Sequence, residues 1–175
     1  MFRGLTEIDG SLEEILSVVS DVPSHPSWMP DCSESRVLRD DGETVVVYRR
    51  TQAPWPVSDR DVVVESRTQV IEPDVEVHVY FRSVDEPSVE PASGAPASGS
   101  GSGAVRMPYL VGHYKLRALG PGRTRVEYQV DADPGGRLPG WLAAGTSRGN
   151  PVRTLVGLQR QVQARRTPPV ASGAP

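Results

Sequence analysis

Apolar and polar residues alternate through much of this chain, at the spacing of half-buried β-strands. Residues 75–82 give the clearest example, in which Val, Val, Val and Phe alternate with Glu, His, Tyr and Arg. The same period of two runs through residues 110–118 and 126–130, and residues 44–51 and 61–71 are rich in β-branched side chains. Because a period of two puts alternate side chains on opposite faces, these segments predict a sheet with one buried face.

Short turn signals separate the strands. Asp-Asp-Gly at residues 40–42, Pro-Asp at 73–74 and Gly-Pro-Gly at 120–122 each lie between apolar runs. Such connections have no room for a crossover helix, so we predict an antiparallel meander.

Helices are predicted on both sides of this strand region. Ser11 and Glu14 form a capping box in front of an apolar face that continues to Val19. A short strand precedes this helix. The chain ends in a long helix whose first turn accepts Pro139, and Asn-Pro at residues 150–151 predicts a kink or a new start there.

Two segments have almost nothing to bury. Residues 85–104 and the tail 167–175 consist mostly of Pro, Ala, Ser and Gly. We expect the first to be a flexible loop inserted between paired strands and the second to be disordered. Residues 1–166 then form one domain of the α+β class, in which a curved antiparallel sheet wraps around the long C-terminal helix. Such an arrangement leaves a cavity if the inward side chains do not fill it.

Composition excludes several classes of function. The chain has 175 residues and a formal net charge of −3, with no basic cluster, which argues against nucleic-acid binding. No apolar run approaches the ~20 residues of a membrane span, and the N-terminus lacks the apolar core of a signal peptide. We therefore expect a cytoplasmic protein. Cys32 is the single cysteine, so no internal disulfide forms.

No motif for a metal, a cofactor or a nucleophile is present. His25, His78 and His113 do not share a metal-ligand spacing, and the two strand histidines lie on polar faces where a solvated role is expected. The chain has no G-x-S-x-G motif or P-loop, and its alternating glycines at 99–103 lie in low-complexity sequence. Arg60 and Asp61 are expected to cap a strand end and pair locally. We expect no catalytic residue, no metal and no cofactor.

Several segments together resemble a known family. They are Trp-Met-Pro-Asp-Cys at 28–32, Trp-Pro at 55–56 before Asp-Arg-Asp at 59–61, Asp-Pro-Gly-Gly-Arg-Leu-Pro at 133–139, and the helix at 151–158. In this order the sequence resembles the START domains, bacterial type, of the Bet v 1-like (SRPBCC) helix-grip superfamily. The resemblance implies a helix-grip fold with an internal hydrophobic tunnel under the C-terminal helix, which holds one sterol, phospholipid or other apolar molecule.

The sequence departs from that family in two places. Family members usually carry an additional N-terminal segment with a helix and the opening strand region, and Met1 falls near the second half of that region, so we expect either a shortened gene model or a trimmed lid and sheet edge. Many animal members also have a buried acid–arginine pair in the tunnel, whose arginine falls at Ser66 and whose acid falls near Val47 or Tyr48. The pair is therefore not carried over, and sterol specificity is not implied.

Twelve residues are predicted to line the tunnel, from strand alternation and from the resemblance. They are Trp55, Val62, Val64, Ser66, Thr68, Val77, Val79, Tyr114, Tyr128, Trp141, Leu142 and Leu155. The alternative for the two tryptophans is core or lid packing. For Ser66 and Thr68 it is ordinary sheet packing that faces water.

The predicted function is binding of a lipid or sterol-like hydrophobic molecule, for transport or sensing, without catalysis. The protein would act as a monomer with transient membrane contact, and residues 145–151 would be the hinge that lets the ligand enter. This prediction fails if side chains fill the space between sheet and helix. The alternative is an enzyme similar to polyketide aromatases/cyclases, which requires pocket groups such as Tyr114, Tyr128 or Arg49. A third hypothesis is a sensor or adaptor, in which the bound ligand changes a surface that meets a partner protein.

Overall fold

The computed structural model describes residues 1–86, 89, 103–136 and 140–167, without the side chains of residues 140–150. Its elements are β1 (Phe2–Asp9), α1 (Leu12–Ser20), a 3-10 turn η1 (Val22–Ser24), α2 (His25–Trp28), β2 (Cys32–Asp40), β3 (Thr44–Thr51), β4 (Asp59–Glu72), β5 (Glu76–Ser83), β6 (Ala104–Arg106), β7 (Tyr109–Gly120), β8 (Arg123–Asp133) and α3 (Gly140–Arg166).

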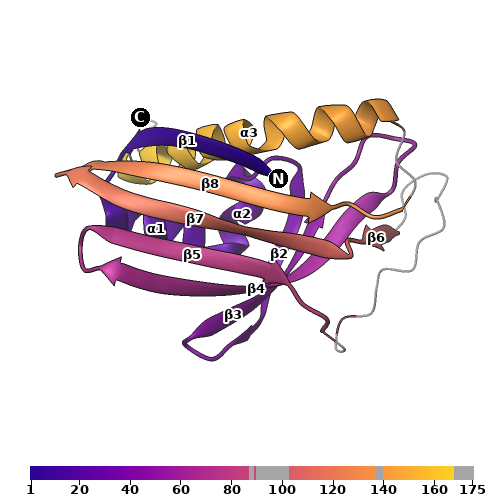
Figure 1. Ribbon diagram of the computed structural model, residues 1–175, viewed down its shortest axis with the longest axis horizontal. Helices are drawn as coiled ribbons and strands as arrows, with labels where there is room; N and C mark the ends of the chain where they lie inside the picture. Colours follow the sequence, from indigo (N-terminus) through magenta and orange to yellow (C-terminus); the bar gives the residue numbers. More distant parts are fainter. Residues whose placement is uncertain (87–88, 90–102, 137–139, 168–175) are drawn as a thin grey trace, which may run out of the picture.

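The strands form one curved sheet in the order β1-β8-β7-β5-β4-β3-β2, in which all these neighbours are antiparallel (Figure 1). The helices α1 and α2 lie behind the sheet, and α3 runs along it next to β1 (Figure 1). This confirms the predicted α+β fold. The short strand β6 was not predicted, and it pairs in parallel with β4, at the register Arg60 to Val105.

The helix signals were read correctly at α1 and incorrectly at α3. In α1 the Glu14 backbone N–H donates to Ser11 Oγ at 3.2 Å, and the Ser11 N–H donates to the Glu14 carboxylate at 2.6 Å. The helix α3 is continuous through Pro151, which excludes a new helix start at residues 150–151; the predicted alternative, a kink there, stays a prediction. Pro151 is buried against Gly4 of β1, and that packing compensates for the backbone hydrogen bond that proline cannot make.

Two glycines let α3 approach its neighbours closely. A Cβ atom on Gly157 would lie 2.1 Å from the carbonyl oxygen of Trp28, and one on Gly4 would lie 2.7 Å from the Leu155 side chain. The helix therefore contacts the end of α2 and the strand β1 directly, without room for a bound molecule at these points.

The main core fills the space under the described half of α3. Leu155, Leu158 and Val162 are buried there against side chains of β1, α1, β7 and β8. The prediction of a tunnel between the sheet and the C-terminal helix was therefore wrong for this half of the helix. The close approach at the glycines brings α3 near enough for its leucines to fill the gap.

The predicted loop at 85–104 was too long. Ala104 is buried and begins β6, and Val89 packs on the outer face of the sheet against the cluster of Val46, Tyr48 and Val63. The rest of that loop, residues 87–88 and 90–102, and all but the first residue of the predicted tail lie outside the described residues.

Arg60 makes a local contact, in which Nη1 donates to the Ser58 carbonyl, but Arg60 and Asp61 also bind distant segments, which the prediction of a purely local pair missed. Arg60 Nε donates to the Pro134 carbonyl at 2.8 Å, which ties β4 to the segment after β8. Asp61 is fully buried and accepts from Arg106 Nε of β6 at 2.9 Å. Alternation along the strand showed the polar positions but could not show which segments they face.

The strand histidines lie on the outer face of the sheet, as predicted, but they are partnered and not simply solvated. His78 is only 8% exposed, and its Nε2 lies 2.6 Å from Glu76 Oε1, while His113 Nε2 lies 3.1 Å from Glu127 Oε1.

No helix in the described part of the chain is long and apolar enough to cross a bilayer.

Candidate functional site

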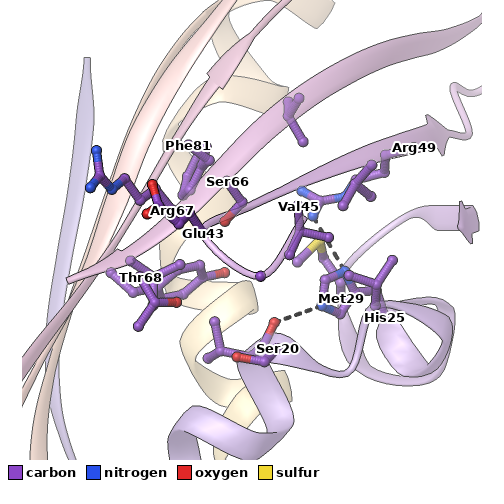
Figure 2. Close-up of a pocket in the computed structure, with 17 residues that line it drawn as sticks. Ser20, His25, Met29, Glu43, Val45, Arg49, Ser66, Arg67, Thr68 and Phe81 are labelled. Atoms are coloured by element: carbon purple, nitrogen blue, oxygen red, sulfur yellow. Dashed lines mark hydrogen bonds between the residues drawn. The ribbon is translucent and has the colours of Figure 1, made fainter. Parts of the chain in front are cut away.

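A cavity of about 340 Å³ lies between the helices α1 and α2 and the inner face of β3, β4, β5 and β7. Figure 2 shows its lining side chains. Most of its wall is apolar and comes from Val19, Val22, Met29, Val45, Val47, Val64, Val79 and Phe81. The turn between β2 and β3 closes one side.

Strand alternation explains the sheet wall of the cavity. Val45, Val47 and Arg49 of β3 face inward, opposite Ser66, Val64 and Val62 of β4 in the antiparallel register. Their neighbours Val46 and Tyr48 point to the other face of the sheet. One strand thus supplies both an apolar wall and a cation to the cavity.

Three aromatic rings close the cavity on the β5–β7–β8 side. The ring centroids of Tyr114 and Tyr128 are 4.5 Å apart, and Phe81 lies 6.0 Å from Tyr114. Gly112 makes this possible, because a Cβ atom there would lie 2.5 Å from the Phe81 ring. Phe81 and Tyr114 line the cavity, while Tyr128 is buried behind them.

The mouth of the cavity lies at exposed residues. Ser20 at the end of α1, Glu43 in the β2–β3 turn, and Arg67 and Thr68 of β4 are exposed and border the same space. His25 and Arg49 lie at the other end of the cavity, away from Glu43, Arg67 and Thr68 (Figure 2). The site therefore has a polar, exposed mouth, an apolar middle and a second polar group at its inner end.

His25 is buried at this inner end and has a defined tautomer. Its Nε2 lies 3.0 Å from the carbonyl oxygen of Val19, which can only accept, so Nε2 carries the hydrogen. Its Nδ1 then accepts hydrogen bonds from Arg49 Nη2 at 3.3 Å and from Ser35 Oγ at 3.4 Å. Burial, and next the charge of Arg49, lower the pKa of His25 to about 4, so the ring is neutral at neutral pH.

Arg49 is half-buried and has no carboxylate partner. No ion pair among the described residues includes it, and its Nε–H is buried without a hydrogen-bond acceptor. The hydroxyl of Tyr114 is likewise buried without a partner, and burial raises the pKa of Tyr114 well above its usual value. Two unpartnered groups that can donate hydrogen bonds thus belong to residues of the same cavity.

The structure brings five of the twelve predicted tunnel residues to the cavity wall: Val64, Ser66, Thr68, Val79 and Tyr114. Four others are buried outside that wall: Val62, Val77, Tyr128 and Leu155. Trp55 is 86% exposed and lies outside this wall, between two prolines in the loop that joins β3 to β4, so its prediction as a lining residue was wrong for this cavity. The side chains of Trp141 and Leu142 lie outside the described residues.

Sequence reasoning missed the helical wall of the cavity. Val19 was interpreted only as the end of a helix face, Val22 was not considered, and His25 was considered only as a metal ligand and rejected. Their positions depend on how α1, η1 and α2 fold over the sheet, which no periodicity reports. The alternation of residues 44–51, in contrast, contained enough signal to place Val45 and Val47 beside Arg49 on one face.

The comparisons with known proteins agree with this architecture. The model of the START domain matches residues 1–156, which include every residue of the cavity wall. The chain belongs to the START domain family. A protein of Pseudomonas aeruginosa is 33% identical over 164 residues, which cover 94% of this chain and 76% of that protein.

Two solved structures show how far the similarity extends. A STAR-related lipid transfer protein from Xanthomonas axonopodis is 28% identical, with a TM-score of 0.73 over 92% of this chain and 84% of that one. The Zhui aromatase/cyclase from a Streptomyces species is 14% identical, with a TM-score of 0.61 over 98% of this chain and 97% of that one. The second likeness shows a shared fold alone.

Proposed function

We propose that this START domain binds one lipid or other hydrophobic small molecule in the cavity between α1–α2 and β3–β5, for transport or sensing and without catalysis. The observation that carries the proposal is the cavity itself, which has a volume of about 340 Å³ and includes six valines among its lining residues. Small-molecule pockets typically have ~300–1,000 Å³ and apolar linings. The name of the Xanthomonas relative, a lipid transfer protein, supports the same class of ligand.

Desolvation would drive binding. Each Å² of apolar ligand surface that leaves water contributes roughly 25 cal/mol. The buried valines Val47, Val64 and Val79 offer such contact, and the polar side chains at the inner end orient the molecule.

We further propose that the ligand enters between the end of α1 and the β2–β3 turn. The exposed residues Ser20 and Glu43 border the cavity there, whereas α3 is held against α2 at Gly157. The hinge predicted at residues 145–151 lies in the part of α3 without described side chains and stays a prediction. Transient contact of this mouth with a membrane would let an apolar molecule pass without crossing water.

A cavity-filling substitution tests the proposal. Ser66→Phe places a ring on the inner face of β4, where Ser66 lines the cavity opposite Val45 and Phe81. Gln69→Phe, three residues later and exposed, is the matched control. We expect a fluorescent fatty-acid or sterol probe to bind the native chain and Gln69→Phe equally, and Ser66→Phe at least about tenfold more weakly. Equal binding by both variants would place the ligand elsewhere.

An aromatase/cyclase-like enzyme is the second candidate, because His25, Arg49 and Tyr114 converge on one cavity. Their chemistry favours binding over proton transfer. Both nitrogens of His25 are already engaged, its lowered pKa makes it a weak base, and the raised pKa of Tyr114 makes it a weak acid. Cyclisation of a poly-β-keto analogue by the native chain, lost in Tyr114→Phe, would support the enzyme.

A further inference from the structure

We propose that the cavity selects a molecule with an apolar body and a carboxylate head group, and that the Arg49 guanidinium binds that head group. This inference rests on the proposed function and names its ligand class.

Arg49 is a cation without a counter-ion. Arg49 points into the cavity, and no carboxylate of the described residues lies within 4.0 Å of it. Its neighbour Arg50 on the opposite face of β3 is paired with Asp59 at 2.8 Å, so of these two adjacent arginines only the inward one lacks a carboxylate. Removing a charge from water is costly unless an opposite charge and hydrogen bonds compensate. A bound anion would supply both.

His25 positions the Arg49 side chain without neutralising its charge. The neutral ring accepts one hydrogen bond from Arg49 Nη2 through Nδ1, and Val19 fixes the ring from the other side. Figure 2 shows the two side chains directed toward one another. A guanidinium has five N–H donors, so four remain, and the buried Nε–H is among them.

The buried hydroxyl of Tyr114 also lacks a hydrogen-bond partner. This residue is only 4% exposed, lines the same cavity, and has no acceptor for its O–H. Arg49 only donates hydrogen bonds, and the Tyr114 hydroxyl is free to donate. Both residues thus have a donor that is left without an acceptor, and carboxylate oxygens are acceptors that bind guanidinium in a planar, bidentate geometry.

The shape of the site agrees with this chemistry. The polar end lies inside, and Val45, Val47 and Val64 line the path toward the exposed mouth. The one carboxylate of the described wall, Glu43, belongs to the exposed β2–β3 turn, away from Arg49. A fatty-acid-like molecule would thus bind head inward, with its chain along the valines.

Binding of dodecanoate and of dodecanol, measured by calorimetry below their aggregation limits, tests the inference. The two probes have the same chain and differ in head-group charge. We expect the native protein to prefer the acid by about 10- to 100-fold, the usual effect of hydrogen bonds to a charged group. Arg49→Met should abolish this preference, because it weakens the binding of dodecanoate and leaves the binding of dodecanol unchanged. Arg82→Met, which removes an exposed arginine paired with Glu65 on the outer face, should retain it.

Each outcome decides a separate point. Equal affinities of the native chain for acid and alcohol would overturn the inference and leave the proposed function standing. So would an acid preference that survives in Arg49→Met. If neither probe nor longer-chain versions bind the native chain, the proposed function itself fails. The comparison of acid and alcohol on the native chain needs no variant, so it can still be made if Arg49→Met does not fold. Tyr114→Phe is a second variant, in which we expect a smaller loss of affinity for the acid.

Discussion

Acidification should destabilise this protein through His25 before its carboxylates titrate. In the folded chain the ring is buried and its pKa is about 4, against an ordinary value of 6.5. An unfolded chain therefore binds a proton on His25 below about pH 6.5 that the folded chain does not bind. Stability falls as pH falls from 6.5 toward 4, because the unfolded state gains protons first.

The size of the effect follows from these two values. Between about pH 7.5 and pH 5, the difference in proton binding amounts to about 2 kcal/mol of unfolding free energy. Glu14, Asp41 and Glu127 have lowered pKa values, mainly through hydrogen bonds and nearby arginines. Their stabilising effect is lost only below the ordinary carboxylate range near 4.5. Measurements above pH 5 therefore isolate the histidine.

Urea unfolding of the native chain and of His25→Gln at both pH values measures this effect. The glutamine does not titrate, and His78 and His113 are present in both proteins, so their contributions cancel in the comparison. We expect the stability advantage of the native chain over His25→Gln to shrink by about 2 kcal/mol on acidification. An advantage that is constant with pH, or one that grows at pH 5, would refute the buried neutral state of His25.

Two further predictions concern the frame around the cavity. Gly157→Ala should lower the free energy of unfolding by about 1–3 kcal/mol, because the new Cβ would overlap the Trp28 carbonyl, and this outweighs the better helix propensity of alanine. Thermal unfolding measures the change, and a stabilised variant would contradict the close approach. Asp61→Ala should cost about 3–5 kcal/mol in urea unfolding, because Arg106 loses its fully buried partner, and a loss under 1 kcal/mol would show that the pair is not structural.

Local signals in the sequence predicted the local structure well. The alternation around Val77 and Val79 is that of β5, and Ser11 and Glu14 cap α1 through their own side chains. Both features depend on neighbours along the chain. Pro151 misled the reading of α3, because its cost in a helix is compensated by packing on Gly4, a contact 147 residues away in the sequence (151 − 4).

The site was only half predictable for the same reason. The inward positions of β4 follow from alternation, and Val64, Ser66 and Thr68 border the cavity. The other wall forms where η1 and α2 fold over the sheet, and the short segment from Val22 to Trp28 has no periodicity to read. Trp55 shows the opposite error, since a large aromatic side chain suggested a buried role that its loop does not provide.

Native mass spectrometry of the purified chain, followed by organic extraction and identification of what is released, is the sharpest test of ligand binding. We expect one small apolar molecule per chain, and an acid-bearing one if Arg49 selects the head group. A chain that carries no adduct and takes up neither fatty-acid nor sterol probes would contradict the proposal that this cavity binds hydrophobic molecules.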